Sequence, residues 1–67
     1  MIKLHLSRLM GERRLKIADV ARDTGISRSA LTRIYYEQVE RLDLDTLETL
    51  CRYLQVEIAD FIELTDD

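Results

Sequence analysis

The side chains best suited to bind another molecule in this 67-residue sequence are cations, and they are unevenly distributed. Residues 1–41 contain nine Lys or Arg against five Asp or Glu, whereas residues 42–67 contain one Arg against eight Asp or Glu. This split gives the molecule a charge dipole that could orient it on a polyanion, although the net charge is −3. The alternative interpretation is an ordinary solvated surface with chance asymmetry.

The other reactive side chains do not predict a catalytic or metal site. Asp43, Asp45 and Glu48 are close in sequence, but helix capping and the positive end of a helix dipole explain each of them. His5 and Cys51 stand in unrelated segments, and a metal site needs three or four ligands. A single cysteine also gives no sign of an oxidising compartment. We therefore predict no enzyme activity, no cofactor, no metal and no small-molecule ligand.

Two helical patterns joined at a glycine occupy residues 17–36. The first covers about 17–24 and the second covers 27–36, each with apolar residues at helical spacing on one face. Gly25 can adopt the positive φ that ends a helix, and Ser27 can cap the next helix by accepting a bond from a free backbone N–H. Two short helices crossing steeply at such a turn allow the second helix to enter the major groove of DNA.

This segment resembles the helix-turn-helix of the phage-repressor and Cro (Xre-type) DNA-binding family. That family has apolar residues, an alanine and a glycine at fixed motif positions, and counting from Ile17 the sequence supplies Val20, Ala21, Thr24, Gly25, Ile26, Leu31 and Ile34. Residues 43–62 also resemble the family's fourth and fifth helices, so the resemblance covers nearly the whole chain beyond about Ser7. It implies an all-α, five-helix, lambda-repressor-like bundle forming a single domain over residues 1–67.

The resemblance also implies which residues contact DNA. The residues expected to read base edges are Ser27, Arg28, Ser29, Thr32, Arg33 and Tyr36. Arg28 and Arg33 are the best readers, because a guanidinium can bond O6 and N7 of guanine together. The residues expected at phosphates are Arg13, Arg14, Lys16, Arg41 and, through backbone N–H groups at its helix start, Ile17. The alternative for each is a solvated surface position.

The sequence departs from the family pattern in three places. Ile17 stands where the family often has a glutamine that clamps a phosphate, and Thr24 replaces a larger aliphatic residue. Glu37 and Glu40 follow the second motif helix, where the family usually has a less acidic turn. We expect these two carboxylates to point away from DNA or to pair with Arg41.

The segments around the motif are predicted from their periodicity. Residues 1–6 fit a strand or an early helix equally well, and as a strand they would lack a partner within the chain, so they would pair with a second copy or lie as an arm on the helices. The remaining expected helices cover Arg8–Arg14 capped by Ser7, a segment from Asp43 to Gln55, and Val56–Ile62. The expected apolar stripe of the middle one is Leu44, Leu47, Leu50, Cys51 and Leu54. Tyr35 is expected to be partly buried and Tyr36 exposed.

Together, these patterns predict a transcriptional regulator that binds specific double-stranded DNA with the helix at about 27–36. Because one recognition helix contacts few base pairs, a homodimer on two-fold related half-sites is also expected, through residues 1–6 or a final helix carrying Phe61 and Ile62. No signal peptide and no membrane span of roughly 20 apolar residues is evident, which favours a cytoplasmic protein. The alternative function is a helical protein-interaction module, antitoxin-like or an adaptor, that does not read DNA directly.

Overall fold

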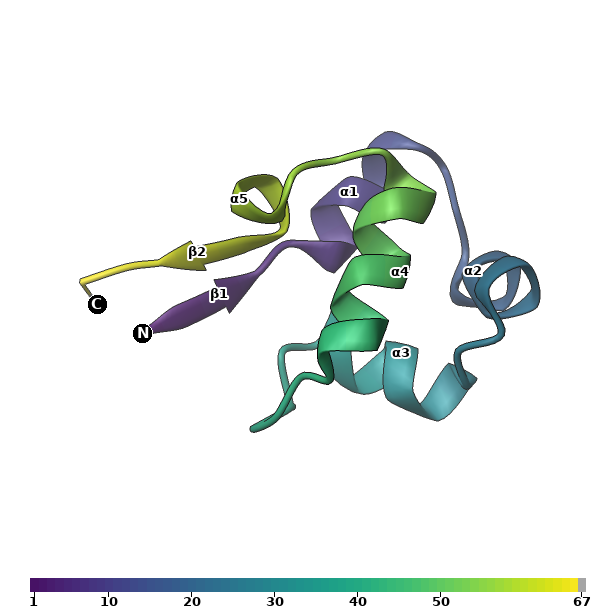
Figure 1. Cartoon of the computed structure of the whole chain (residues 1–67). Helices are drawn as coiled ribbons and strands as arrows, with labels where there is room; N and C mark the ends of the chain where they lie inside the picture. Colours follow the sequence, from purple (N-terminus) through teal and green to yellow (C-terminus); the bar gives the residue numbers. More distant parts are fainter. Residues whose placement is uncertain (67) are drawn as a thin grey trace.

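The computed structural model describes residues 1–66, which form five short helices and a two-stranded antiparallel sheet (Figure 1). The helices are α1 (Leu6–Glu12), α2 (Ile17–Thr24), α3 (Arg28–Tyr35), α4 (Leu44–Leu54) and α5 (Ile58–Phe61). The strands are β1 (Ile2–Leu4) and β2 (Ile62–Leu64). The prediction of five helices is confirmed, but the all-α description omits the small sheet.

One apolar cluster lies where the five helices meet. Its buried members are Leu4, Leu6, Leu9, Met10, Val20, Leu31, Ile34, Leu47, Leu50, Cys51, Leu54 and Phe61. Every helix contributes at least one of these side chains, and no polar or charged side chain within residues 1–66 is buried. The fold therefore depends on apolar burial, whose stabilisation scales with the area removed from water.

The two strands join the ends of the described chain. Ile2 lies opposite Leu64, Lys3 opposite Glu63 and Leu4 opposite Ile62. The prediction that a strand over residues 1–6 would lack a partner in the chain was therefore wrong. The missed partner, β2, is three residues long, which is too short to show a clear period of two.

Three further predictions need correction. Helix α1 runs over Leu6–Glu12 rather than 8–14, because fully buried Leu6 belongs to it and the Leu9 N–H donates to the His5 carbonyl. The expected helix 56–62 is the shorter α5, since the backbone is already extended at Ile62. Leu44 begins α4 on the expected stripe but is 77% exposed, because its helix turn projects beyond the core.

The first four helices are each followed by a residue with positive φ. These residues are Arg14, Gly25, Glu37 and Gln55, with φ of 55°, 79°, 57° and 58°. Only Gly25 lacks a Cβ, and the left-handed conformation costs other residues roughly 1–2 kcal/mol. Gln55 was expected to end α4 and does so, and Asp43 holds the expected N-cap position, although its side chain makes no capping bond.

Replacing each of the two glycines with alanine should change the free energy of unfolding in opposite directions. Gly11 lies within α1, where an added Cβ would meet no atom within 4 Å, so Gly11→Ala should raise the free energy of unfolding by up to about 1 kcal/mol. Gly25→Ala should lower it by about 1–2 kcal/mol, because the cost there comes from φ rather than from crowding. Urea titration followed by circular dichroism measures both, and effects of the same sign would contradict this account.

Candidate nucleic-acid interface

Helices α2 and α3 meet at the left-handed turn of Gly25, at the end of the molecule away from the β1–β2 ribbon (Figure 1). The Gly25 N–H donates to the Ala21 carbonyl at 2.9 Å, which closes α2. The Ser27 hydroxyl accepts a bond from the Ala30 N–H at 3.1 Å, which caps α3. The predicted bounds of α2, the positive φ and the serine cap are confirmed, whereas α3 is one residue shorter at each end than the predicted 27–36.

The hydrogen bonds of Thr24 account for a polar residue at a position where the family pattern has a larger aliphatic one. Its hydroxyl donates to the Val20 carbonyl at 2.6 Å and accepts from the Ile26 N–H at 3.2 Å. One side chain therefore binds a carbonyl of the last turn of α2 and the first free N–H after the glycine. The hydroxyl supports the turn by hydrogen bonding, in place of apolar packing.

Helix α3 has one buried face and one exposed polar face. Leu31 and Ile34 are 0% and 2% exposed. The exposed members of the expected base-reading set are Ser27, Arg28, Ser29, Arg33 and Tyr36, and Thr32 is half-buried. Neither Arg28 nor Arg33 forms an ion pair with any residue in 1–66, so both guanidinium groups are available.

The two neighbouring tyrosines have different environments, as expected. Tyr35 packs against the core cluster, whereas Tyr36 is 62% exposed at the end of α3. Their rings meet edge to face with centroids 5.0 Å apart. The half-buried ring of Tyr35 thus contacts the exposed ring of Tyr36 at the end of α3.

The start of α2 offers backbone donors rather than a side-chain clamp. The Ile17 side chain is half-buried and packs against the core cluster. Within residues 1–66, the N–H groups of Ile17 and Ala18 have no acceptor, while the Lys16 N–H donates to the Asp19 carboxylate at 2.9 Å. Free N–H groups at a helix start favour an anion, whereas the adjacent carboxylate of Asp19 opposes one.

The two short helices joined at Gly25 lie in a segment that a known protein family matches. A family model of the Cro/C1-type helix-turn-helix DNA-binding domain matches residues 5–67. The chain belongs to the Cro/C1-type family. No curated protein sequence matches the chain significantly.

A Cro/C1-type domain binds DNA, so the chain is a DNA-binding regulator in general terms. Within residues 1–66, no group of three His, Cys, Asp or Glu side chains is arranged to hold a metal ion. Nor does this part of the Cro/C1-type chain contain a helix with the length and hydropathy required to span a membrane.

All four cations expected at phosphates are exposed in this Cro/C1-type domain. Those that form no ion pair within residues 1–66 are Arg14, Lys16 and Arg41. Arg13 differs, because its guanidinium donates to the Leu54 carbonyl at 3.2 Å and to the Leu9 carbonyl at 3.1 Å. Arg13 thus joins α1 to the carbonyl end of α4, where a cation is favoured.

Glu37 has a structural role that the sequence did not indicate. It was expected to point away from DNA or to pair with Arg41; it forms no ion pair with Arg41, and its Oε1 accepts a bond from the Leu4 N–H at 2.9 Å. Glu40 is exposed and forms no ion pair with Arg41. The pairing with Arg41 was therefore wrong, and Glu37 links the end of α3 to the outer edge of β1.

A hydrogen-bonded cluster joins α2 to α4. The Tyr53 hydroxyl donates to the Asp23 carboxylate at 2.6 Å, and Arg22 contacts Asp23 at 3.1 Å and Asp19 at 3.4 Å. The Tyr53 hydroxyl and then the Arg22 guanidinium hold the pKa of Asp23 below its ordinary value, and the bond to Asp23 raises the pKa of Tyr53. This cluster holds the first motif helix on the bundle.

Removing the Tyr53 hydroxyl should raise the pKa of Asp23 toward the ordinary value of about 3.9. A lowered pKa in the folded state stabilises the fold above the unfolded-state pKa, and this contribution is lost as the pH falls through the folded-state pKa. The stability difference between wild type and Tyr53→Phe should therefore shrink in acid. NMR titration of the Asp23 carboxyl carbon and urea titrations at several pH values measure both effects.

Tyr36→Phe is the matched control for this experiment. Tyr36 is exposed and its hydroxyl has no hydrogen-bond partner among residues 1–66. The control should leave the titration of Asp23 unchanged. An unchanged pKa of Asp23 in Tyr53→Phe would show that the bond to Tyr53 does not set it.

Proposed function

We propose that this Cro/C1-type domain binds specific double-stranded DNA sequences as a transcriptional regulator, with α3 in the major groove. The observation that carries this proposal is the exposed face of α3, where Arg28 and Arg33 stand unpaired among hydroxyl side chains. The B-DNA major groove is about 12 Å wide, which admits an α-helix of about 10–12 Å diameter. The steep turn at Gly25 supports this insertion, because α2 does not continue in line with α3.

The base-reading residues are Ser27, Arg28, Ser29, Thr32, Arg33 and Tyr36. Arg28 and Arg33 each bond a guanine through two N–H groups, which is worth about 1–3 kcal/mol against other bases. The hydroxyl groups of Ser29 and Thr32 bond bases or phosphates. Ser27 uses one lone pair to cap α3, so its O–H remains free to donate.

The phosphate contacts come from Arg14, Lys16 and Arg41, from the backbone at Ile17, and from Arg13. The free N–H groups at the start of α2 support the backbone contact. Arg13 contributes less as a direct ligand, because two carbonyls already accept from its guanidinium. Phosphate contacts fix the register of α3 without reading sequence.

The DNA site that we propose is an inverted repeat bound by two copies of the chain. A helix of eight residues contacts few base pairs, and half-sites about one helical turn apart double the sequence that is read. Phe61 does not serve as a dimer contact, because it is fully buried in its own core. Residues 2–4 pair with 62–64 of the same chain, so they also do not need a second copy to complete a sheet.

Selection from random duplex DNA tests this function. We expect an enriched inverted repeat, and a plot of log K against log[salt] with a slope of several units, about −0.9 for each phosphate neutralised. Measurement at four or more salt concentrations separates phosphate contacts from base contacts. Absence of any enriched sequence would overturn the regulator proposal.

Single substitutions assign the roles of the cations. Arg28→Ala or Arg33→Ala should relax preference at one base position in each half-site, whereas Lys16→Ala should weaken all sequences alike and flatten the salt slope. Lys3→Ala, which removes the same charge from the distant ribbon, is the control and should change neither. If Arg28→Ala bound every site as well as the wild type does, the assignment of Arg28 as a base-reading residue would be wrong.

A further inference from the structure

The turn after α3 connects the helix that we propose reads DNA to the β1–β2 ribbon. The Glu37 N–H donates to the Ile34 carbonyl at 3.1 Å. The Gln38 N–H donates to the Arg33 carbonyl at 2.7 Å. Because Glu37 has a φ of 57°, these two bonds form the left-handed closure that commonly ends a helix. The Glu37 carboxylate extends from this closure and accepts the bond from the Leu4 N–H at 2.9 Å.

The Leu4 N–H requires an acceptor outside the ribbon. On one side of it, the Met1 carbonyl accepts from the Thr65 N–H at 2.8 Å. On the other side, the His5 N–H donates to the Phe61 carbonyl at 2.8 Å. Bonding toward the partner alternates along an antiparallel strand, so the backbone of Leu4 faces away from β2. An unpaired N–H at this edge of the core would be costly, and the turn after α3 supplies its acceptor.

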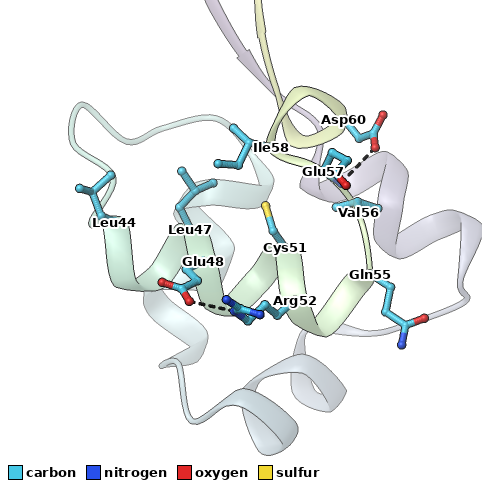
Figure 2. Close-up of a pocket in the computed structure, with 10 residues that line it drawn as sticks. All are labelled: Leu44, Leu47, Glu48, Cys51, Arg52, Gln55, Val56, Glu57, Ile58 and Asp60. Atoms are coloured by element: carbon cyan, nitrogen blue, oxygen red, sulfur yellow. Dashed lines mark hydrogen bonds and ion pairs between the residues drawn. The ribbon is translucent and has the colours of Figure 1, made fainter.

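This bond is the one hydrogen bond within residues 1–66 that joins the ribbon to the connector over residues 36–43. A hollow of about 170 Å³, bordered by both strands and by residues 39–42, separates the two segments, so apolar contacts do not fill the space between them. The larger groove of about 720 Å³ lies between α4 and α5, and none of its lining residues belongs to α3, the connector or the ribbon (Figure 2). The Glu37 side chain is thus the direct polar link between the end of α3 and β1.

Glutamate is otherwise an unfavourable residue at this position. Glycine is the usual residue in a left-handed closure, because a Cβ disfavours a positive φ. A negative charge is also unfavourable at the C-terminal end of a helix, where the free carbonyls already carry partial negative charge. The same charge repels the phosphates of DNA bound beside α3. Glycine would avoid all three effects, but it would leave the Leu4 N–H without its acceptor.

We propose that Glu37 is a positioning residue for DNA reading, which fixes the C-terminal end of α3 by tying it to β1. The other end of α3 is held by the turn at Gly25. Arg33 and Tyr36 lie at the end next to Glu37, whereas Arg28 begins the helix. A guanidinium that bonds a guanine through two N–H groups tolerates little displacement. The link therefore sets the contacts of Arg33 and Tyr36 and leaves those of Arg28 unaffected.

This inference rests on the proposed function, since it concerns how α3 is held while it reads DNA. It deepens that function by giving the ribbon a part in base preference. It also accounts for an acidic residue in a turn where the Cro/C1-type pattern is usually less acidic.

Two substitutions of Glu37 separate the hydrogen bond from the charge. Glu37→Ala removes both, whereas Glu37→Gln removes the charge and keeps an amide oxygen that can accept from the Leu4 N–H. Both variants should bind all sequences more tightly at low salt, because a repulsion is lost. Only Glu37→Ala should lose preference at the base position that Arg33→Ala identifies, by about fivefold or more, the lower end of what one bidentate arginine contributes. Preference at the position assigned to Arg28 should be kept.

Binding to an isolated half-site carrying each single base change measures these preferences. Glu40→Ala is the matched control, because Glu40 is an exposed carboxylate of the same connector that forms no ion pair within residues 1–66. It should keep the preference at every position, and circular dichroism checks that each variant is folded. Equal loss of preference in Glu37→Gln and Glu37→Ala, or a uniform loss at all base positions, would contradict a positioning role.

The backbone side of the bond provides a second test that leaves Glu37 intact. Chemical synthesis of the 67-residue chain allows the Leu4 amide to be replaced by an ester, which deletes the N–H and keeps the buried side chain. The ester should reproduce the base preferences of Glu37→Ala, and the two changes together should lose little more than either alone. Additive losses would show that the two groups do not act through one bond.

Amide hydrogen exchange follows the contact itself. The Leu4 N–H should exchange slowly in the wild type and in Glu37→Gln, and faster in Glu37→Ala, because only the last variant lacks the acceptor. Equal exchange in all three chains would refute the link between α3 and β1.

Selection from random duplex DNA with the wild type and with Glu37→Ala separates this inference from the proposed function. A wild-type chain that enriches no sequence would refute the proposed function, and this inference with it. An enriched sequence that Glu37→Ala selects with unchanged preference at every position would refute the positioning role alone.

Discussion

The left-handed backbone at Gly25 is the constraint on which both the core and the candidate interface depend. Val20 precedes this turn, and Leu31 and Ile34 follow it, and all three are buried in the same cluster. If the chain continued straight from α2, the apolar faces on either side of Gly25 could not converge on one core. The same change of direction leaves Arg28 and Arg33 exposed, so the packing of the core and the exposure of these arginines depend on one turn.

Local features of the sequence were sufficient to predict the motif. Gly25, the capping hydroxyl of Ser27 and the apolar spacing on either side act over three or four residues, and the structure confirms each. The structure leaves Arg28 and Arg33 exposed on the sides of α3 that Leu31 and Ile34 do not occupy. Whether these arginines read bases is a separate question about DNA, which the spacing alone does not address.

The features that could not be predicted are contacts between distant segments. Glu37 bonds the backbone of Leu4, and Arg13 bonds the carbonyl of Leu54; neither pairing leaves a trace in local periodicity. The spacing of α4 correctly placed Leu44 on an apolar stripe. It contained no information on whether the chain itself or another molecule covers that stripe, and the structure leaves Leu44 exposed.

The pairing of β1 with β2 has a consequence for the order in which the chain becomes structured during synthesis. Residues 2–4 leave the ribosome before the five helices, whereas their partners at 62–64 follow all of them. Helices α1 to α3 rely on nearby residues and can assemble while translation continues, whereas the ribbon requires closure of a loop of about sixty residues. Until then Leu4 lacks its neighbour Ile62, so the edge of the core beside Leu4 stays uncovered in the nascent domain until β2 emerges.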